Sequence, residues 1–239
     1  MAIVSNTVGY LDGDVALEGF FAYDDAIAGP RPVVLIHHAW GGRDGFVAEK
    51  AKLLAELGYL GFAADAYGRG VLGKNPEENA GLMQPFMADR AQLQRRLHAA
   101  LSAAKLLPWA DNAKIAAIGF CFGGLCALDL ARSGADLRGV VSFHGLLLPP
   151  DNIPEPRIKA KVLVLHGHDD PMAPSAQVQA LQVELTRAGA DWQVHSYGNT
   201  MHAFTNPVAN NPGFGTVYQP LADRRSWQAL QNFLAEIFA

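Results

Sequence analysis

The sequence predicts an α/β fold: a mainly parallel sheet of about eight strands with an antiparallel hairpin at its N-terminal start, helices on both faces and no large separate lid domain. Three observations favour it. Short apolar runs alternate with helical patterns along most of the 239 residues. Half of the residues are hydrophobic, which suits one domain with a continuous core over residues 1–239. Polar loops follow the apolar runs, as they do at the carboxyl ends of parallel strands.

The first elements are a hairpin and a buried strand. Residues 7–10 and 15–21 alternate around an Asp-Gly turn within residues 11–14, where glycine accepts the positive φ of a tight turn. Residues 33–36 form a continuous apolar run, typical of a parallel strand that is buried on both faces. The hairpin therefore begins the sheet and the parallel part follows it.

The next segment predicts a helix, a strand and a long connection. Asp44 can cap a helix over residues 46–57, which Gly58 ends, and a strand follows over residues 59–64. Residues 65–85 are rich in Gly, Asn and Pro with weak periodicity, which favours a long loop at the rim of a pocket.

The second half continues the alternation of strand and helix. A helix begins at Asp89 and Pro108 follows its end, while the final amphipathic helix has Asp223 near its cap. Between them the sequence predicts a strand ending before Cys121, strands over 140–143, 162–165 and 193–197, a Pro-rich loop over 149–156 and a helix over 174–188.

Charge and composition exclude several classes of partner. The formal net charge of −4 comes from interspersed acids and bases, which argues against nucleic acid or an anionic membrane. The N-terminus has no secretory signal pattern and no window approaches eighteen apolar residues, so the expected location is the cytoplasm. Cys121 and Cys126 lie on different faces of a turn and helix, so neither a disulfide nor a zinc site follows. The expected partner is a small molecule.

Residues 119–123, Gly-Phe-Cys-Phe-Gly, have the form of a nucleophile elbow with cysteine in place of serine. They lie between an apolar strand and a helix of small residues, where the glycines permit a sharp turn. The alternative is that Cys121 is a packed small hydrophobe, a role that we assign to Cys126 inside the helix. The strand-to-helix context favours Cys121 as a nucleophile.

The side chains that a cysteine nucleophile needs occur later in the chain. A thiol is mostly protonated at neutral pH, so an imidazole must generate the thiolate and a carboxylate must orient that imidazole. Asp169 or Asp170 follows one predicted strand and His202 follows another. The order nucleophile, acid, histidine is that of the α/β-hydrolase fold.

The sequence resembles the dienelactone hydrolase family, the cysteine hydrolases of the α/β-hydrolase fold, over nearly its whole length. The matching motifs are Gly-Phe-Cys-Phe-Gly-Gly at 119–124, Leu-Ala-Glu-Leu-Gly-Tyr at 54–59 leading to Asp-Ala-Tyr-Gly-Arg at 65–69, His-Gly-His-Asp-Asp-Pro-Met-Ala-Pro at 166–174 and Met-His-Ala-Phe at 201–204.

The resemblance implies a mechanism and its residues. Cys121 would attack an ester carbonyl, His202 would act as base and then acid, and Asp170, at the family's position for the acid, would orient His202. The backbone N–H groups of Phe122 and Ala39 would hold the oxyanion. The family mechanism needs no cofactor and no metal.

Two positions depart from the family's pattern. The family has a glutamate beside the oxyanion-hole residue, where this chain has His38, so activation of the thiol would differ. The family also binds a substrate carboxylate with arginines, and one of these positions is Asn206 here. Arg69 or Arg90 could substitute for the other arginine. Losing an arginine contact favours an uncharged substrate.

Further pocket residues are proposed from their places in or near loops, although each could equally belong to the core. Besides His38, Arg69 and Asn206, they are Trp40, Phe86, His144 and Met172.

The sequence thus predicts a carboxylic ester hydrolase that favours activated, uncharged esters or lactones. The same thiolate could attack phosphorus in a neutral phosphotriester, and a dienelactone hydrolase proper is a further alternative. Histidines near strand ends could suggest a metal hydrolase, but tight ligand spacing is missing. A non-catalytic binding protein is a third class. A homodimer is one candidate for the oligomeric state.

Overall fold

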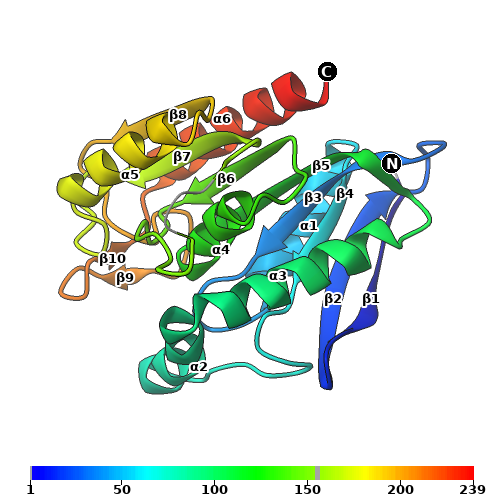
Figure 1. Ribbon diagram of the computed structural model, residues 1–239, viewed down its shortest axis with the longest axis horizontal. Coiled ribbons are helices and arrows are strands. Elements are labelled where there is room, and N and C mark those ends of the chain that lie inside the picture. Colours follow the sequence, from blue (N-terminus) through cyan, green and yellow to red (C-terminus); the bar gives the residue numbers. More distant parts are fainter. Residues whose placement is uncertain (1, 154–156) are drawn as a thin grey trace. The chain divides into compact units, whose positions relative to one another are not determined.

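The computed structural model describes residues 2–153 and 157–239. It divides into two compact units, residues 1–117 and 118–239. Figure 1 shows the order of the elements along the chain. The prediction of one domain over residues 1–239 stays a prediction.

The first unit begins with the predicted hairpin. β1 (Ile3–Asp12) and β2 (Val15–Asp24) pair in antiparallel register around a turn in which Gly13 has a φ of 58°. β2 pairs antiparallel with β4 (Leu60–Ala64), and β4 pairs in parallel with β3 (Arg31–His37). β3 and β4 are almost wholly buried, as their continuous apolar runs predict.

Two helices cover the strands of the first unit, one on each face (Figure 1). α1 (Gly45–Glu56) begins at the predicted cap, because the Asp44 carboxylate accepts hydrogen bonds from the backbone of Phe46 and Val47. α3 (Arg90–Lys105) begins in the same way at Asp89. The predicted Asp44 cap is therefore confirmed, and so is the predicted start of a helix at Asp89.

The predicted long loop over residues 65–85 is wrong in its second half, where α2 (Pro76–Ala88) forms. The start signals for this helix were present in the sequence: Asn75 accepts from the Glu78 backbone, Pro76 occupies the first turn, and Glu77 favours the helix N-terminus. The helix buries only Phe86, so its apolar periodicity is too weak to predict it.

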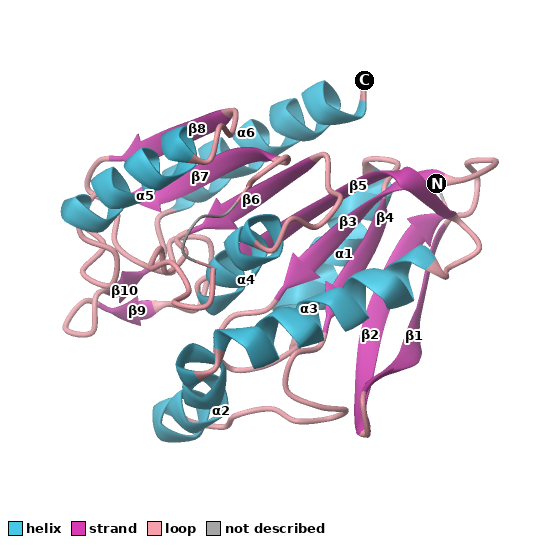
Figure 2. Ribbon diagram, in the orientation of Figure 1, coloured by secondary structure: helices cyan, strands magenta, loops and turns pink. Residues whose placement is uncertain are grey.

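The second unit repeats the strand and helix pattern. Its elements are the end of β5 (Ala110–Phe120, which begins in the first unit), α4 (Phe122–Arg132), β6 (Gly139–Phe143), β7 (Lys161–Gly167), α5 (Ser175–Arg187), β8 (Trp192–Tyr197) and α6 (Pro220–Phe238). β6, β7 and β8 pair in parallel, in that order. Figure 2 shows α4 and α5 on one face of these strands and α6 on the other.

The predicted fold class is confirmed. Among the described residues, eight strands form a mostly parallel sheet that starts with the antiparallel hairpin and is flanked by helices. Two details differ from the prediction. Gln219 caps α6, and Asp223 lies one turn inside the helix. A short hairpin of β9 (Asn210–Asn211) and β10 (Thr216–Val217) was not predicted. Residues 154–156 of the predicted Pro-rich loop lie outside the described residues.

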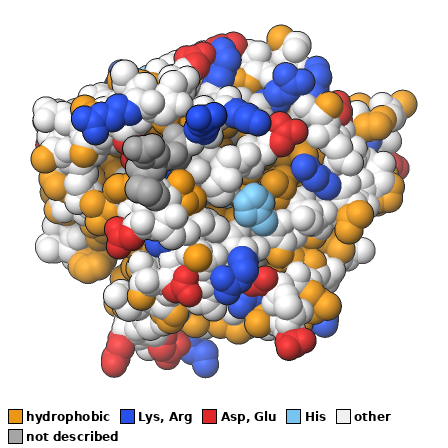
Figure 3. Space-filling view, in the orientation of Figure 1, with side chains coloured by type: hydrophobic (Ala, Val, Ile, Leu, Met, Phe, Trp, Pro, Cys, Tyr) orange, Lys and Arg blue, Asp and Glu red, His pale blue; other side chains and the backbone are white. Residues whose placement is uncertain are grey.

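The surface agrees with the interspersed charges of the sequence. Acidic and basic side chains alternate with polar and apolar ones on the face in Figure 3, without a continuous basic band. In the part of the chain that the structure describes, none of the helices combines the length and the apolar character needed to span a membrane.

Candidate active site

Cys121 occupies a sharp turn between β5 and α4, with φ of 58° and ψ of −116°. Such backbone angles are strained for a residue other than glycine and typically cost about 1–3 kcal/mol, so the surrounding structure must impose them. The Cys121 N–H donates to the carbonyl of Phe143 at 3.0 Å, which attaches the turn to the end of β6. A side chain at position 119 would collide with the carbonyl of Gly123, so the turn requires glycine there.

The environment of Cys121 differs from that of Cys126. The side chain lies at the N-terminus of α4 but makes no capping hydrogen bond there, and the residue is partly exposed, unlike the buried Cys126. The partial positive charge of a helix N-terminus favours a thiolate.

His202 is 1% exposed and lies in the loop that follows β8. Its backbone is held on both sides by the unpredicted hairpin: its N–H donates to Gly215 at 3.0 Å and its carbonyl accepts from Val217 at 3.1 Å. The small β9 and β10 strands thus position the histidine. Their only sequence signal was the turn-forming run Asn-Asn-Pro-Gly at residues 210–213.

Asp170 holds His202 from the other side. His202 Nδ1 donates to Asp170 Oδ2 at 2.7 Å, and both residues are buried. The second carboxylate oxygen accepts from the Met172 backbone at 2.8 Å, which fixes the carboxylate. Asp169 is exposed. Of the two candidate acids, Asp170 is the one that contacts the imidazole.

The pKa of His202 reflects opposing influences. Burial by itself lowers the pKa of His202, but the charge of Cys121 and the hydrogen bond to Asp170 outweigh it and raise the pKa to about 10. Because Nδ1 faces Asp170, Nε2 is the nitrogen that remains for a reacting group, and it has no hydrogen-bond partner among the described residues. The nearby Cys121 and Asp170 therefore favour the protonated imidazole.

His144 was predicted to line a pocket, but it is only 3% exposed. It follows β6, has a φ of 37° and shares a 2.8 Å hydrogen bond between its Nε2 and Oγ1 of Thr205. Its ring centroid lies 5.1 Å from that of His202. His144 thus packs against the loop that carries His202, and its role in a substrate pocket stays a prediction.

The other predicted pocket residues of the second unit lie in the loops around His202 and Asp170. Met172 is partly exposed and follows Asp170 by two residues. Asn206 is also partly exposed, and its side-chain oxygen accepts from the backbone of Val208 at 3.2 Å. Part of the polar capacity of Asn206 is therefore used within its own turn.

His38, in the first unit, is a buried neutral histidine. Its Nε2 accepts from the Ala66 N–H at 3.2 Å, so Nδ1 carries the proton and donates to the carbonyl of Ala39 at 2.6 Å. Burial lowers its pKa, which opposes a charged form. The ring links the loops after β3 and β4.

Trp40, Arg69 and Phe86 also belong to the first unit. The carbonyl of Trp40 accepts from the Tyr67 hydroxyl at 3.0 Å, and Phe86 is buried with its ring 5.7 Å from that of Tyr67. The Arg69 side chain is largely exposed and pairs with Glu18 at 3.3 Å. The roles of these residues and of Ala39 in binding or oxyanion stabilisation stay predictions.

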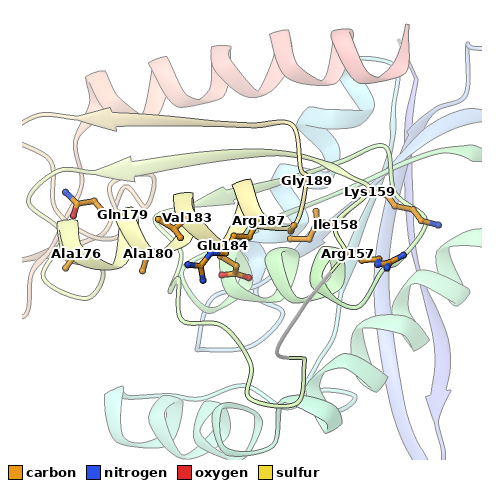
Figure 4. Close-up of a pocket in the computed structure, with 11 residues that line it drawn as sticks. Arg157, Ile158, Lys159, Ala176, Gln179, Ala180, Val183, Glu184, Arg187 and Gly189 are labelled. Carbon is orange, nitrogen blue, oxygen red and sulfur yellow. The ribbon is translucent and has the colours of Figure 1, made fainter.

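A surface groove in the second unit is lined by none of Cys121, His202 and Asp170. It has a volume of about 1170 Å³ and runs along α5 and the segment before β7 (Figure 4). Its lining residues are Arg157, Ile158, Lys159, Ala176, Gln179, Ala180, Val183, Glu184, Arg187, Ala188 and Gly189. Among the described residues, no three His, Cys, Asp or Glu side chains are grouped as a metal site would require.

Comparison with known proteins assigns the family. The sequence profile of the dienelactone hydrolase family matches residues 17–238. The chain belongs to this family. As a member of the dienelactone hydrolase family, it is a hydrolase.

Relatives of this dienelactone hydrolase family member include characterised and uncharacterised proteins. Carboxymethylenebutenolidase from Pseudomonas putida is 28% identical over 204 residues, which cover 82% of this chain and 84% of that protein. The uncharacterised protein K02A2.1 from Caenorhabditis elegans is 42% identical over 151 residues, which cover 62% of this chain and 96% of that one.

Solved structures match along the whole of both chains. The dienelactone hydrolase-like promiscuous phosphotriesterase P91, from metagenomic libraries, is 39% identical and superposes with a TM-score of 0.95. A putative dienelactone hydrolase from Klebsiella pneumoniae, at 22% identity and a TM-score of 0.81, has the same fold.

Proposed function

We propose that this hydrolase cleaves carboxylic ester or lactone bonds with Cys121 as nucleophile, His202 as base and acid, and Asp170 as the group that orients His202. The observation that carries the proposal is the buried 2.7 Å bond from His202 to Asp170, together with the raised pKa of His202 beside the thiol. These are the properties that a thiolate nucleophile needs at neutral pH.

The first half of the reaction forms a thioacyl enzyme. The Cys121 thiolate attacks the carbonyl carbon, and the negative charge moves to the carbonyl oxygen. The Phe122 N–H, at the start of α4, is suited to stabilise this oxyanion, and family resemblance adds the Ala39 N–H. As the carbon–oxygen ester bond breaks, the His202 imidazolium gives its proton to the leaving alkoxide.

The second half returns the enzyme to its resting state. Neutral His202 takes a proton from water as the water attacks the thioacyl carbon. The carbon–sulfur bond breaks, the acid product leaves, and Cys121 regains its thiolate next to the protonated imidazole. Asp170 keeps Nδ1 protonated throughout, so that Nε2 always faces the reacting groups.

We propose activated, uncharged esters as preferred substrates. The family's arginine position is Asn206 here, and its side-chain oxygen already bonds its own turn. An amide cannot supply the charge-assisted, bidentate contact that an arginine gives to a carboxylate. An anionic substrate such as dienelactone therefore loses one strong contact. Hydrolysis of dienelactone is the alternative activity.

A second candidate activity is hydrolysis of neutral phosphotriesters, favoured by the 39% identity to P91 over the full chain. The same thiolate would attack phosphorus, the aryl oxide would leave, and water would hydrolyse the phosphorylated cysteine. Both candidate substrates are uncharged. The same binding site, without an arginine for a carboxylate, could therefore accept either of them.

The test is a panel of p-nitrophenyl esters, dienelactone and neutral aryl phosphotriesters, assayed with the wild type and Cys121→Ala. We expect ester turnover in the wild type, a loss of at least about a thousandfold in Cys121→Ala, and lower kcat/KM for dienelactone than for neutral esters. Undiminished esterase activity in Cys121→Ala would refute the mechanism. Cys126→Ala is the matched control, because its side chain is buried in α4.

A further inference from the structure

We infer that His144 and Thr205 form a positioning clamp for His202, an inference that rests on the proposed function. The clamp is the 2.8 Å hydrogen bond between His144 Nε2 and Thr205 Oγ1. Neither side chain belongs to the acid, base or nucleophile set. Both act by holding the loop that carries His202.

The end of β6 contacts both the Cys121 turn and the loop that carries His202. The carbonyl of Phe143 accepts from the Cys121 N–H at 3.0 Å and so holds the nucleophile turn. The next residue, His144, donates its own N–H to Leu165 in β7 at 2.8 Å and directs its ring at the histidine loop. Phe143 and His144, at the end of β6, therefore help to position both Cys121 and the loop that carries His202.

The loop after β8 that carries His202 requires tertiary contacts to hold it, because its backbone is strained. Ala203, directly after His202, has a φ of 57°, which costs free energy in a residue with a Cβ. Thr205 lies two residues further on and is 1% exposed, and Phe204 packs its ring 5.1 Å from that of His144. The bond and the ring contact oppose relaxation of the turn at Ala203.

The clamp complements two other restraints on His202. β10 holds its backbone and Asp170 holds Nδ1. Beyond His202 the backbone is also bonded, from the Asn206 N–H to the Ala203 carbonyl at 2.9 Å and from the Gln219 N–H to the Phe204 carbonyl at 3.1 Å. The bond from Thr205 to His144 adds a side-chain restraint to this loop, and without it the loop that presents Nε2 is held less firmly. A misplacement of about 1 Å can cost on the order of a hundredfold in rate. Charged or titratable groups that act on this region are Cys121, Asp170, His144 and His166.

The variants that test the clamp are Thr205→Val, which removes the hydroxyl at nearly constant shape, and Thr205→Ser, which keeps it. Thr200→Val is the matched control: Thr200 is equally buried in the same loop, but its hydroxyl bonds Gly198 at 3.1 Å and not His144. Each variant is assayed for kcat and KM and for the pH dependence of iodoacetamide alkylation at Cys121.

In Thr205→Val we expect kcat to fall about tenfold or more with little change in KM, and the alkylation profile to shift to higher pH. Thr205→Ser should restore both, and Thr200→Val should resemble the wild type even if its melting temperature falls. If Thr205→Val does not fold, His144→Phe carries the same expectation, because it keeps the ring and loses the nitrogen.

Wild-type kcat and an unshifted profile in the folded Thr205 or His144 variant would overturn the clamp. Equal effects in Thr205→Val and Thr200→Val would overturn it as well, because they would indicate a general packing role. Failure of the proposed function has a different signature: Cys121→Ala would stay active, whatever the Thr205 variants do.

Discussion

At the scale of single residues, His202 is the point where opposing effects meet. Burial disfavours a charged imidazole, yet the thiolate and Asp170 raise its pKa to about 10. The charge of Cys121 is the largest of the raising causes. The neighbouring Cys121 therefore favours the protonated form of His202.

Removing the thiol of Cys121 should lower the pKa of His202. In Cys121→Ala we expect the pKa of His202 to fall well below that of the wild type, because burial then opposes fewer favourable charges. Titration of the imidazole by NMR measures it, with Cys126→Ala as the control that should titrate like the wild type. An unchanged His202 titration in Cys121→Ala would contradict the ion pair.

The same shift predicts a pH dependence of stability. The pKa of His202 is about 10 in the folded protein, against 6.5 for a histidine in an unfolded chain, so its protonation contributes stability that is complete below pH 6.5 and lost as the pH rises through 10. Urea unfolding from pH 6 to 10.5 should show the wild type losing stability relative to His202→Gln across this window. A constant difference would argue against the raised pKa.

At the scale of elements, close backbone approach decides which glycines matter. Gly119, at the end of β5, leaves no space for a Cβ beside the Gly123 carbonyl, whereas Gly81 in α2 faces open space. Gly61 in β4 is also confined, against the backbone of Ala51 in α1. Composition alone does not separate these positions.

Gly119→Ala should disrupt the nucleophile turn, with loss of esterase activity and a lower melting temperature, because the new methyl group must displace the backbone of α4. Gly81→Ala, an exposed helical site, should keep activity and gain up to about 1 kcal/mol. Thermal unfolding and p-nitrophenyl ester assays compare the two. Normal activity in Gly119→Ala would show that the turn is less constrained than its geometry indicates.

At the scale of the molecule, a buried ionic cluster ties distant parts of the second unit together. Arg132 in α4 is almost fully buried and pairs with Asp129 at 3.2 Å and with Glu184 of α5 at 2.7 Å. It also donates to the carbonyls of Leu147 and Leu148. Such a cluster fixes the arrangement of the segments that it joins.

Arg132→Met should destabilise the protein by about 3–5 kcal/mol, because the buried Asp129 carboxylate loses its ion pair with Arg132. The change in the urea midpoint measures this. Arg187→Met is the control, since Arg187 is exposed at the end of α5, and it should change stability by less than about 0.5 kcal/mol. If the two substitutions lowered stability by similar amounts, the Arg132 cluster would have no special role in stability.

The sequence by itself determined the order of most strands and helices, the Asp44 cap, the start of a helix at Asp89, and the strand-to-helix turn at Cys121. These follow from local rules: apolar period, capping side chains and glycine freedom act over a few residues. α2 escaped prediction because it buries a single side chain, so the signal that identifies a helix was weak although its caps were present.

Only the tertiary structure showed the contact by which Asp170, the acid that the family resemblance implies, bonds His202. It also paired His144 with Thr205 and placed the β9 and β10 hairpin against His202. Each of these depends on a distance between residues far apart in the chain. Period and composition carry no information about such a distance, because it is set by how strands and loops pack.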